Sequence, residues 1–367
     1  MKILIGMPDE DSWGGPAASE PPFVDALHSL GVDVATETYV YGDKNKPTPL
    51  FSRVSRVIQT ALRFRRRTRD EKFDLIHLNT AFDRKTVLRD AVSIFLMRPR
   101  RTHVFLKIHG SGAHEIPVRS RLFRPLIKYL TRHVDGLGVH TKEEVEDLKA
   151  HGFTPSKFYM VKNAIEIEEL IPKDFKRVQK DSSECFELLF ISRFIKAKGL
   201  IETINAGSLL HERGVKFKLA CVGDGPIRGE AEDLVRSLDL ENHVEFTGYA
   251  TEKEVLNRLL TGDIFVFPTT HTEGFPNILF RSVAVGLPIV TTPVRAAAEY
   301  LSEPENCLFC TPEPDNIADK LETIINDRSL RDRMSESNRQ FGRLLTKEVI
   351  AKEFLEVYQK ICSPDFK

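Results

Sequence analysis

The sequence predicts an α/β protein with two doubly wound domains in tandem. Short β-branched and apolar runs alternate with helical patterns, which indicates parallel strands joined by crossover helices. The alternation stops at a polar stretch and then restarts, and 367 residues is about twice a common domain length. We therefore expect a first Rossmann-like domain over residues 1–170, a linker over 171–183, a second over 184–342, and a C-terminal helical segment over 343–367 packing across both.

In the first half, the expected strands are short apolar runs bounded by polar or turn residues. They are Lys2–Met7, Val32–Thr38, Leu75–Leu78, His103–Ile108, Gly136–Val139 and Phe158–Val161. The expected helices between them show apolar residues at helical spacing. They lie near Phe23–Leu30, Phe51–Arg69, Lys85–Met97, Arg121–Arg132 and Lys142–Ala150.

The second half repeats this plan. Its expected strands are Glu187–Ile191, Lys216–Val222, Val244–Thr247, Ile264–Phe267 and Pro288–Thr291. Its expected helices lie near Gly199–Arg213, Ile227–Leu238, Lys253–Leu260, Asn277–Val285 and Asn316–Asn326, with a final helix at about Lys347–Ile361. Two such domains in tandem predict an interdomain cleft at the carboxyl ends of the strands, where doubly wound folds bind ligands.

Composition excludes several classes of protein. Hydrophobic residues make up 41% and charged residues 29%, which is typical of a globular protein and too apolar for a disordered one. No apolar stretch is long enough to span a bilayer, and the apolar start is too short for a signal peptide. Five cysteines do not make a disulfide framework in a chain of this length. We expect a reduced, cytoplasmic protein.

Charge is balanced overall, with 53 basic and 53 acidic residues, but it is uneven along the chain. Residues 51–133 carry 20 basic and 6 acidic side chains. Basic residues mixed with Val54, Ile58, Leu62 and Phe64 at helical spacing indicate a basic amphipathic helix. Such a helix favours an anionic membrane surface as partner, with peripheral binding at the inner membrane face, over a nucleic acid. A solvated helical face is the alternative.

Glycines follow the first expected strand. Gly14 and Gly15 would let backbone N–H groups approach a phosphate in front of a helix N-terminus, although a simple turn also explains them. They do not form the Gly-x-Gly-x-x-Gly pattern, so nicotinamide or flavin binding has little support.

More specific signals lie in the second half. Ser192 and Arg193 end a strand and Lys198 opens the next helix, so two cations should face the carboxyl edge, where they suit a pyrophosphate. A carboxylate, Glu273, stands just before another helix N-terminus and could hold sugar hydroxyls while backbone amides face an anion.

These segments together resemble one known family. Arg193 with Lys198-Gly199, Gly223-Asp224-Gly225-Pro226, Phe246-Thr247-Gly248-Tyr249, Glu273-Gly274-Phe275-Pro276 and Gly286-Leu287-Pro288 have the order and spacing of the family-4 glycosyltransferases, which are retaining enzymes of the GT-B fold. The similarity covers essentially the whole chain and is strongest in its second half.

The resemblance implies roles for the matching residues. Arg193 and Lys198 are similar to the pair that neutralises the donor pyrophosphate, and Glu273 to a glutamate that binds donor-sugar hydroxyls. His109 resembles a histidine near the reacting sugar carbon, and Gly15 a glycine of the loop that closes over the phosphates. Donor-binding positions on the same basis are Gly14, Gly15, Ser192, Gly223, Asp224, Gly225, Tyr249, Gly274, Phe275, Pro276, Asn277, Ile278, Arg281 and Glu299.

The sequence also departs from the family pattern. Arg281 stands where the family has a second glutamate that accepts hydrogen bonds from the ribose, and arginine has only donors. Residues 295–298 read Arg-Ala-Ala-Ala before Glu299, where relatives have Gly-Gly, and Ala164 replaces the glycine of an Asn-Gly pair. Another group could hold the ribose, Arg281 could contact phosphate, or donor binding could be impaired.

The resemblance implies a retaining glycosyltransferase that moves a sugar from a nucleoside-diphosphate sugar to a hydroxyl of a saccharide or lipid-linked acceptor. Cell-surface polysaccharide or glycolipid assembly is the expected context. No cofactor and no metal are expected, and Cys307 and Cys310 are interpreted as packing residues rather than metal ligands. The alternatives are a catalytically weakened subunit that binds sugar nucleotides, suggested by Arg281, and a nucleotide-sugar epimerase, which no motif supports.

Overall fold

The computed structural model describes residues 1–9, 15–39, 50–97, 102–117, 120–166, 171, 175, 177 and 180–363. The chain forms two compact units, one of Met1–Glu166 with Lys347–Lys367 and one of Ile167–Thr346. The segment 171–183, which the sequence analysis interpreted as the linker, therefore lies in the second unit. Arg177 shows why, because its guanidinium donates a 2.8 Å hydrogen bond to the Leu259 carbonyl oxygen of that unit.

The first unit contains a six-stranded parallel sheet of order β2-β1-β3-β4-β5-β6. The strands are β1 (Lys2–Met7), β2 (Asp33–Thr38), β3 (Leu75–Thr80), β4 (His103–Ile108), β5 (Gly136–Val139) and β6 (Phe158–Met160). The six predicted runs are thus confirmed as strands, with ends displaced by at most two residues. The chain crosses over from strand to strand through helices, as a parallel sheet requires.

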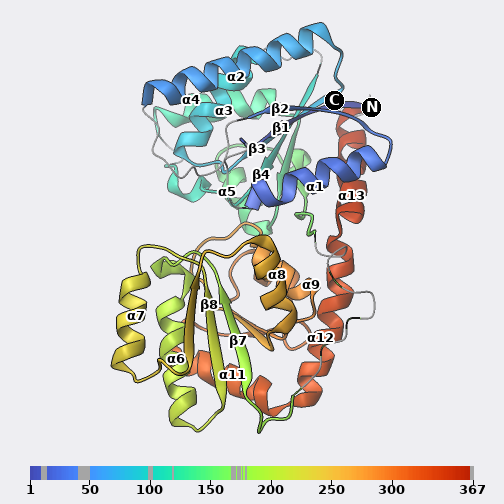
Figure 1. Ribbon diagram of the computed structural model, residues 1–367. Helices are drawn as coiled ribbons and strands as arrows, with labels where there is room; N and C mark the ends of the chain where they lie inside the picture. Colours follow the sequence, from blue (N-terminus) through green and yellow to red (C-terminus); the bar gives the residue numbers. More distant parts are fainter. Residues whose placement is uncertain are drawn as a thin grey trace. The chain divides into compact units, whose positions relative to one another are not determined.

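Helices cover both faces of this sheet (Figure 1). The helices are α1 (Gly15–Ser29), α2 (Leu50–Asp70), α3 (Arg84–Met97), α4 (Phe123–His133), α5 (Lys142–Ala150) and α13 (Lys347–Cys362). α1 and α13 pack together on one face, where Phe23, Phe105 and Phe354 share a core. α2, α3 and α4 pack side by side over the other face, whose core includes Phe64 and Leu106.

The second unit repeats this architecture with a parallel sheet of order β12-β11-β10-β7-β8-β9. Its strands are β7 (Phe186–Ile191), β8 (Phe217–Val222), β9 (Val244–Gly248), β10 (Ile264–Phe267), β11 (Ile289–Thr291) and β12 (Leu308–Phe309). Its helices are α6 (Leu200–Glu212), α7 (Arg228–Ser237), α8 (Glu252–Thr261), α9 (Asn277–Ala284), α10 (Ala296–Tyr300), α11 (Pro314–Asn326) and α12 (Arg328–Gly342). The two sheets confirm the predicted fold class of tandem doubly wound domains.

Some elements differ from the prediction. α1 begins at Gly15, whereas the predicted helix began near Phe23. Pro21 and Pro22 lie inside the helix, and the prediction did not extend a helix through them. α10, α12 and the two-residue strand β12 were not predicted. The buried face of α12 includes the polar side chains of Arg331 and Asn338, so it lacks the apolar periodicity that marks a helix.

Candidate functional site

The carboxyl edge of the second sheet brings together the segments singled out in the sequence. Arg193 lies just after β7, Asp224 just after β8, Tyr249 just after β9, and Glu273 in the loop that joins β10 to α9. All these strands are parallel, so their carboxyl ends share one edge of the sheet. Ligands of doubly wound folds bind at this edge.

Glycines allow the loops at this edge to touch through their backbones. Gly223 has a φ of +137°, and a Cβ added there would lie 1.9 Å from the Ser192 carbonyl oxygen. A Cβ on Gly225 would lie 2.3 Å from the carbonyl oxygen of Phe194. The Phe194 N–H donates to the Asp224 carbonyl oxygen at 2.9 Å. Only glycine fits such contacts, so the motif Gly223-Asp224-Gly225 is needed to close the loops.

A short 3₁₀ turn, Lys196–Lys198, carries the central cation. The Ala197 carbonyl oxygen accepts hydrogen bonds from the backbone N–H groups of Thr270 at 2.8 Å and His271 at 3.1 Å. These bonds hold the β10–α9 loop against the turn. As a result the Lys198 ammonium group contacts Oε1 of Glu273.

Lys198 and Glu273 are largely shielded from water, with side chains 12% and 17% exposed. Burial, and then the positive charge of Arg193, lower the pKa of Lys198 to about 8. The adjoining Glu273 carboxylate acts in the opposite direction. The Arg193 side chain itself is exposed. The two predicted cations and the predicted carboxylate therefore form one cluster.

The segment after Glu273 leads into α9. Phe275 is buried and stacks on Phe280, with ring centroids 3.9 Å apart. This contact anchors the loop to the helix, so that Gly274 and Pro276 are buried and Asn277 and Ile278 form the first turn of α9. The N–H groups of a first helical turn favour an anion.

Two other predicted positions lie at the rim of this edge. Asp224 accepts a 2.7 Å hydrogen bond from the Gly225 N–H and lies 3.2 Å from the Arg228 guanidinium. Tyr249 is 65% exposed.

The departures from the family pattern have clear structural consequences. The Arg281 guanidinium lies 2.6 Å from the Glu252 carboxylate at the start of α8, so its charge is neutralised by a neighbour. Arg295 takes the left-handed backbone conformation, with φ of +43°, at the start of α10. A glycine would adopt this conformation without strain. Glu299 lies in α10 and is half-buried.

In the first unit, His109 follows β4 at the carboxyl edge of the sheet. Its Nε2 lies 2.7 Å from Oδ1 of Asn79, whose Nδ2 donates to the Gly6 carbonyl oxygen at 3.1 Å. The neutral imidazole therefore carries its proton on Nε2. His109 Nε2 is also 3.6 Å from the Glu20 carboxylate, which accepts a 2.7 Å hydrogen bond from the Lys107 ammonium.

This cluster is buried, and burial decides its protonation. Burial and the Lys107 charge lower the pKa of His109 well below its ordinary value. Burial would raise the pKa of Glu20, but the charge of Lys107, together with His77 and the hydrogen bonds from Lys107 and Asn79, lowers it. His109 is thus held neutral beside an ionised carboxylate.

Sequence reasoning missed Glu20, Lys107 and Asn79. A signal was present, because Lys107 stands inside an otherwise apolar strand, and a buried lysine requires a counter-charge. Two glycines were predicted after the first strand. Gly15 is the first residue of α1, and Gly14 lies outside the described residues.

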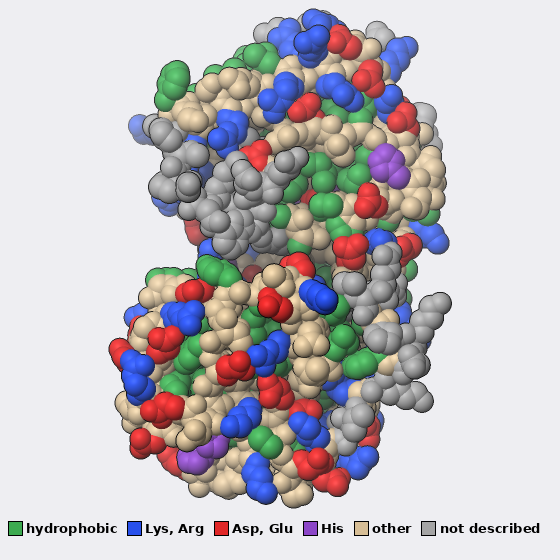
Figure 2. Space-filling model, in the orientation of Figure 1, with side chains coloured by type: hydrophobic (Ala, Val, Ile, Leu, Met, Phe, Trp, Pro, Cys, Tyr) green, Lys and Arg blue, Asp and Glu red, His purple; other side chains and the backbone are tan. Residues whose placement is uncertain are grey.

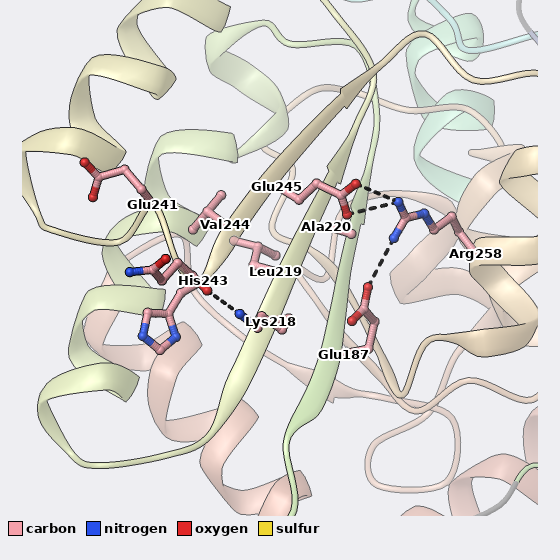
Figure 3. A pocket seen from close by; sticks show the side chains of 10 residues that line it. Glu187, Lys218, Leu219, Ala220, Glu241, His243, Val244, Glu245 and Arg258 are labelled. Atoms are coloured by element: carbon pink, nitrogen blue, oxygen red, sulfur yellow. Dashed lines mark hydrogen bonds and ion pairs between the residues drawn. The ribbon is translucent and has the colours of Figure 1, made fainter.

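A separate cavity of about 340 Å³ lies beside β7, β8 and β9, and Figure 3 shows its lining. Arg258 bridges Glu187 at 3.3 Å and Glu245 at 2.9 Å, and the Lys218 ammonium donates to the Asn242 carbonyl oxygen (Figure 3). Its Arg258, Glu187 and Glu245 charges thus pair with one another, and the cavity contains no predicted site residue. We assign it no ligand.

The described residues contain no group of three His, Cys, Asp or Glu side chains placed to hold a metal ion. Cys307 and Cys310 are buried, and burial raises the pKa of Cys310 to about 12. None of the described helices has the length and apolar character needed to cross a bilayer.

Two family profiles match the chain in succession. Residues 16–169 match Glycosyltransferase Family 4, and residues 172–341 match Glycosyl transferases group 1. The chain belongs to the family-4 glycosyltransferases. Its architecture is the GT-B fold of that family, as expected from the motifs.

Named relatives in polysaccharide biosynthesis are similar over parts of the chain. The putative colanic acid biosynthesis glycosyltransferase WcaL of Escherichia coli is 31% identical over 35% of this chain and 33% of its own. The capsular polysaccharide biosynthesis glycosyltransferase CapM of Staphylococcus aureus is 25% identical over 57% of this chain and 53% of its own. The chain spans about half or less of the first curated relatives it matches.

A solved structure shares the fold over the full length. The Anabaena protein HepE, solved in complex with UDP, superposes with a TM-score of 0.74 at 17% identity, covering 98% of this chain and 100% of that one.

Proposed function

We propose that this chain is a retaining glycosyltransferase that transfers a sugar from a nucleoside-diphosphate sugar to a hydroxyl of a saccharide or lipid-linked acceptor. The observation that carries the proposal is the cluster of Arg193, Lys198 and Glu273 at the carboxyl edge of the second sheet. HepE has been solved with UDP-glucose, which supports a donor of this class for the shared fold.

The cluster suits a donor because it offers opposite charges side by side. A bound diphosphate would take the Lys198 ammonium as its counter-charge, and the sugar hydroxyls would donate to the released Glu273 carboxylate. Backbone N–H groups at Gly274 and the start of α9 favour the same anion. The site is therefore complementary to a sugar-bearing diphosphate.

The same groups would act in the reaction. As the bond between the sugar and the β-phosphate breaks, negative charge grows on the diphosphate, and Arg193 and Lys198 stabilise it. The acceptor hydroxyl attacks the anomeric carbon on the face that the diphosphate leaves. Because attack and departure use the same face, the new glycosidic bond keeps the anomeric configuration, and the acceptor's proton passes to the departing phosphate. We expect no requirement for a metal ion, because these side chains supply the positive charge.

His109 is placed in this proposal as the group beside the reacting sugar. Its neutral imidazole can exchange hydrogen bonds with sugar hydroxyls without adding a cation. Glu20, Lys107 and Asn79 would act as positioning residues for it.

A panel of nucleoside diphosphates and their sugars tests donor binding by thermal shift, since a ligand that binds only the folded state raises Tm. NMR of the product of a productive pair then reports the anomeric configuration. We expect stabilisation by one nucleoside-diphosphate sugar and an unchanged configuration, with turnover unaffected by EDTA. An inverted product would overturn the retaining mechanism.

The pairing of Arg281 with Glu252 favours one other candidate, a weakened subunit that binds sugar nucleotides. The family resemblance places a ribose-binding carboxylate at position 281, and here an arginine paired with Glu252 stands there instead. Donor binding without hydrolysis or transfer by the purified protein would select this alternative.

A further inference from the structure

Helix α2 (Leu50–Asp70) has apolar residues on two faces, and only one of them is covered. Ala61 and Phe64 point into the core of the first unit and are fully buried. Phe51, Val54, Ile58 and Leu62 lie on the outward face, and their exposed fractions are 85%, 50%, 40% and 47%. Their spacing of three or four residues places them in one row, which we call the α2 stripe.

The α2 stripe is accompanied by cations. The helix contains seven arginines and a single acidic residue, Asp70. Arg65, Arg66 and Arg69 are exposed on the turns that continue the row toward the C-terminal end of the helix. Figure 2 shows Lys and Arg side chains gathered over this part of the first unit.

We infer that α2 is a docking surface for a membrane that contains anionic lipids. The apolar row would enter the boundary between headgroups and acyl chains, and the arginines beside it would contact lipid phosphates. The core contacts of α2 use other residues, Ala61 and Phe64, so the exposed side chains of the stripe do not contribute to the buried core. This inference goes beyond the transfer reaction and does not depend on which donor or acceptor the chain uses.

Charge favours a lipid surface over a second copy of this chain. Two α2 stripes facing each other would place Arg65, Arg66 and Arg69 against the same arginines if the helices were parallel, and against the partner's apolar residues if they were antiparallel. Either arrangement would cover these charges without a counter-charge, which disfavours association. A bilayer supplies apolar depth and negative charge over one continuous surface, which a straight row of about 16 Å can enter without a shaped pocket.

Sedimentation with vesicles tests the inference on the full chain. We expect binding to vesicles of phosphatidylcholine mixed with phosphatidylglycerol, and much weaker binding to phosphatidylcholine alone. Added salt should weaken the binding because it screens the arginine contacts. Equal partitioning into both vesicles would overturn the proposal.

Two sets of variants separate the contributions. The combination Arg65→Gln, Arg66→Gln and Arg69→Gln should reduce partitioning about a hundredfold, at about fivefold per arginine. The combination Phe51→Ser, Ile58→Ser and Leu62→Ser should reduce it about tenfold or more while leaving retention on a heparin column unchanged. Wild-type partitioning by either set would overturn the proposal.

A matched control uses exposed apolar residues elsewhere. Met160→Ser with Leu344→Ser removes side chains that are 44% and 53% exposed, and we expect no effect on vesicle binding. If light scattering instead shows a dimer that the α2 stripe variants dissociate, the stripe belongs to a protein interface and the membrane proposal fails.

Discussion

At the carboxyl edge of the second sheet, loops meet through glycine backbones, and the Lys198–Glu273 cluster lies beside the exposed Arg193. At the corresponding edge of the first sheet, by contrast, the charges of Glu20 and Lys107 are fully enclosed. The second edge therefore combines an exposed cation with a Lys198–Glu273 pair that is only partly shielded. The first edge is a prearranged polar core whose charges already neutralise each other and hold His109 in place.

Substitutions at the two edges should therefore affect different properties, stability at the first edge and turnover at the second. Perturbing the enclosed cluster should first cost stability, because an unpaired buried charge is expensive. Perturbing the second edge should first reduce turnover, because in the proposed mechanism its charges act on the departing diphosphate. Each prediction below tests one side of this contrast.

The largest effect is expected on acidification. Burial lowers the pKa of His77 to about 4 and that of His140 to about 3, and lowers that of His109 well below its ordinary value. These histidines are neutral in the folded chain but take up protons in the unfolded chain below about pH 6.5. The unfolded state thus binds more protons, and stability falls as pH falls from about 6.5 toward 4. His77 and His140 should each cost the first unit about 2 kcal/mol between pH 7 and pH 5, and His109 acts in the same direction.

Urea unfolding with hydrogen-exchange readout follows each unit in the intact chain, β4 for the first and β7 for the second. His140→Gln should reduce the pH dependence reported by β4, and His211→Gln, an exposed position on α6, should leave it unchanged. If the stability reported by β7 fell equally with pH, the two edges would not differ in the way proposed.

Breaking the enclosed ion pair is expected to have the next largest effect. Lys107→Met leaves the Glu20 carboxylate buried without its 2.7 Å partner, which should destabilise the first unit by about 3–5 kcal/mol. The double variant Glu20→Gln with Lys107→Met should recover most of this loss, because no charge is left uncompensated. Lys72→Met, at an exposed position, is the control. A single variant as stable as the control would show that the pair is not needed to hold this edge.

Turnover is the sensitive quantity at the second edge. Lys198→Ala should raise the barrier to transfer by about 2–4 kcal/mol, because one of the cations that stabilise the leaving group is lost. Lys196→Ala lies on the same turn but is exposed, and it should keep near-normal kcat/KM. A loss of kcat/KM in Lys198→Ala that merely follows a fall in Tm would contradict its role and leave the lysine as a structural residue.

The sequence was sufficient to predict every described strand except the two-residue β12, because their apolar runs are short, buried and bounded by turns. It was also sufficient to predict which segments meet at the second edge, since parallel strands place their carboxyl ends together and the motifs follow those ends. The contact between Lys198 and Glu273 joins residues 75 positions apart through backbone bonds to Ala197, and no local pattern encodes such a contact.

The first edge was harder to predict. Glu20 reaches Lys107 only after α1 continues through Pro21 and Pro22, where sequence rules would end a helix. α12 was missed because Arg331 takes a core position, where its guanidinium donates to the Ile324 carbonyl oxygen at 2.7 Å. Such polar burial depends on tertiary partners, which periodicity does not reveal.

The smallest effect is expected from substituting two glycines on either side of one loop. This comparison tests whether backbone contact at glycines holds the second edge together. Gly223→Ala would place a Cβ 1.9 Å from the Ser192 carbonyl oxygen at a φ of +137°, so the loops must move apart, at a cost of about 1–3 kcal/mol. Gly229 lies in α7 with nothing within 4 Å of an added Cβ, and Gly229→Ala should stabilise the second unit by about 0.5–1 kcal/mol. Urea midpoints measure both changes. Donor affinity should fall only for Gly223→Ala, because Gly223, unlike Gly229, contacts the segment of Ser192 and Arg193. Two substitutions with the same sign would mean that backbone contact does not define this edge.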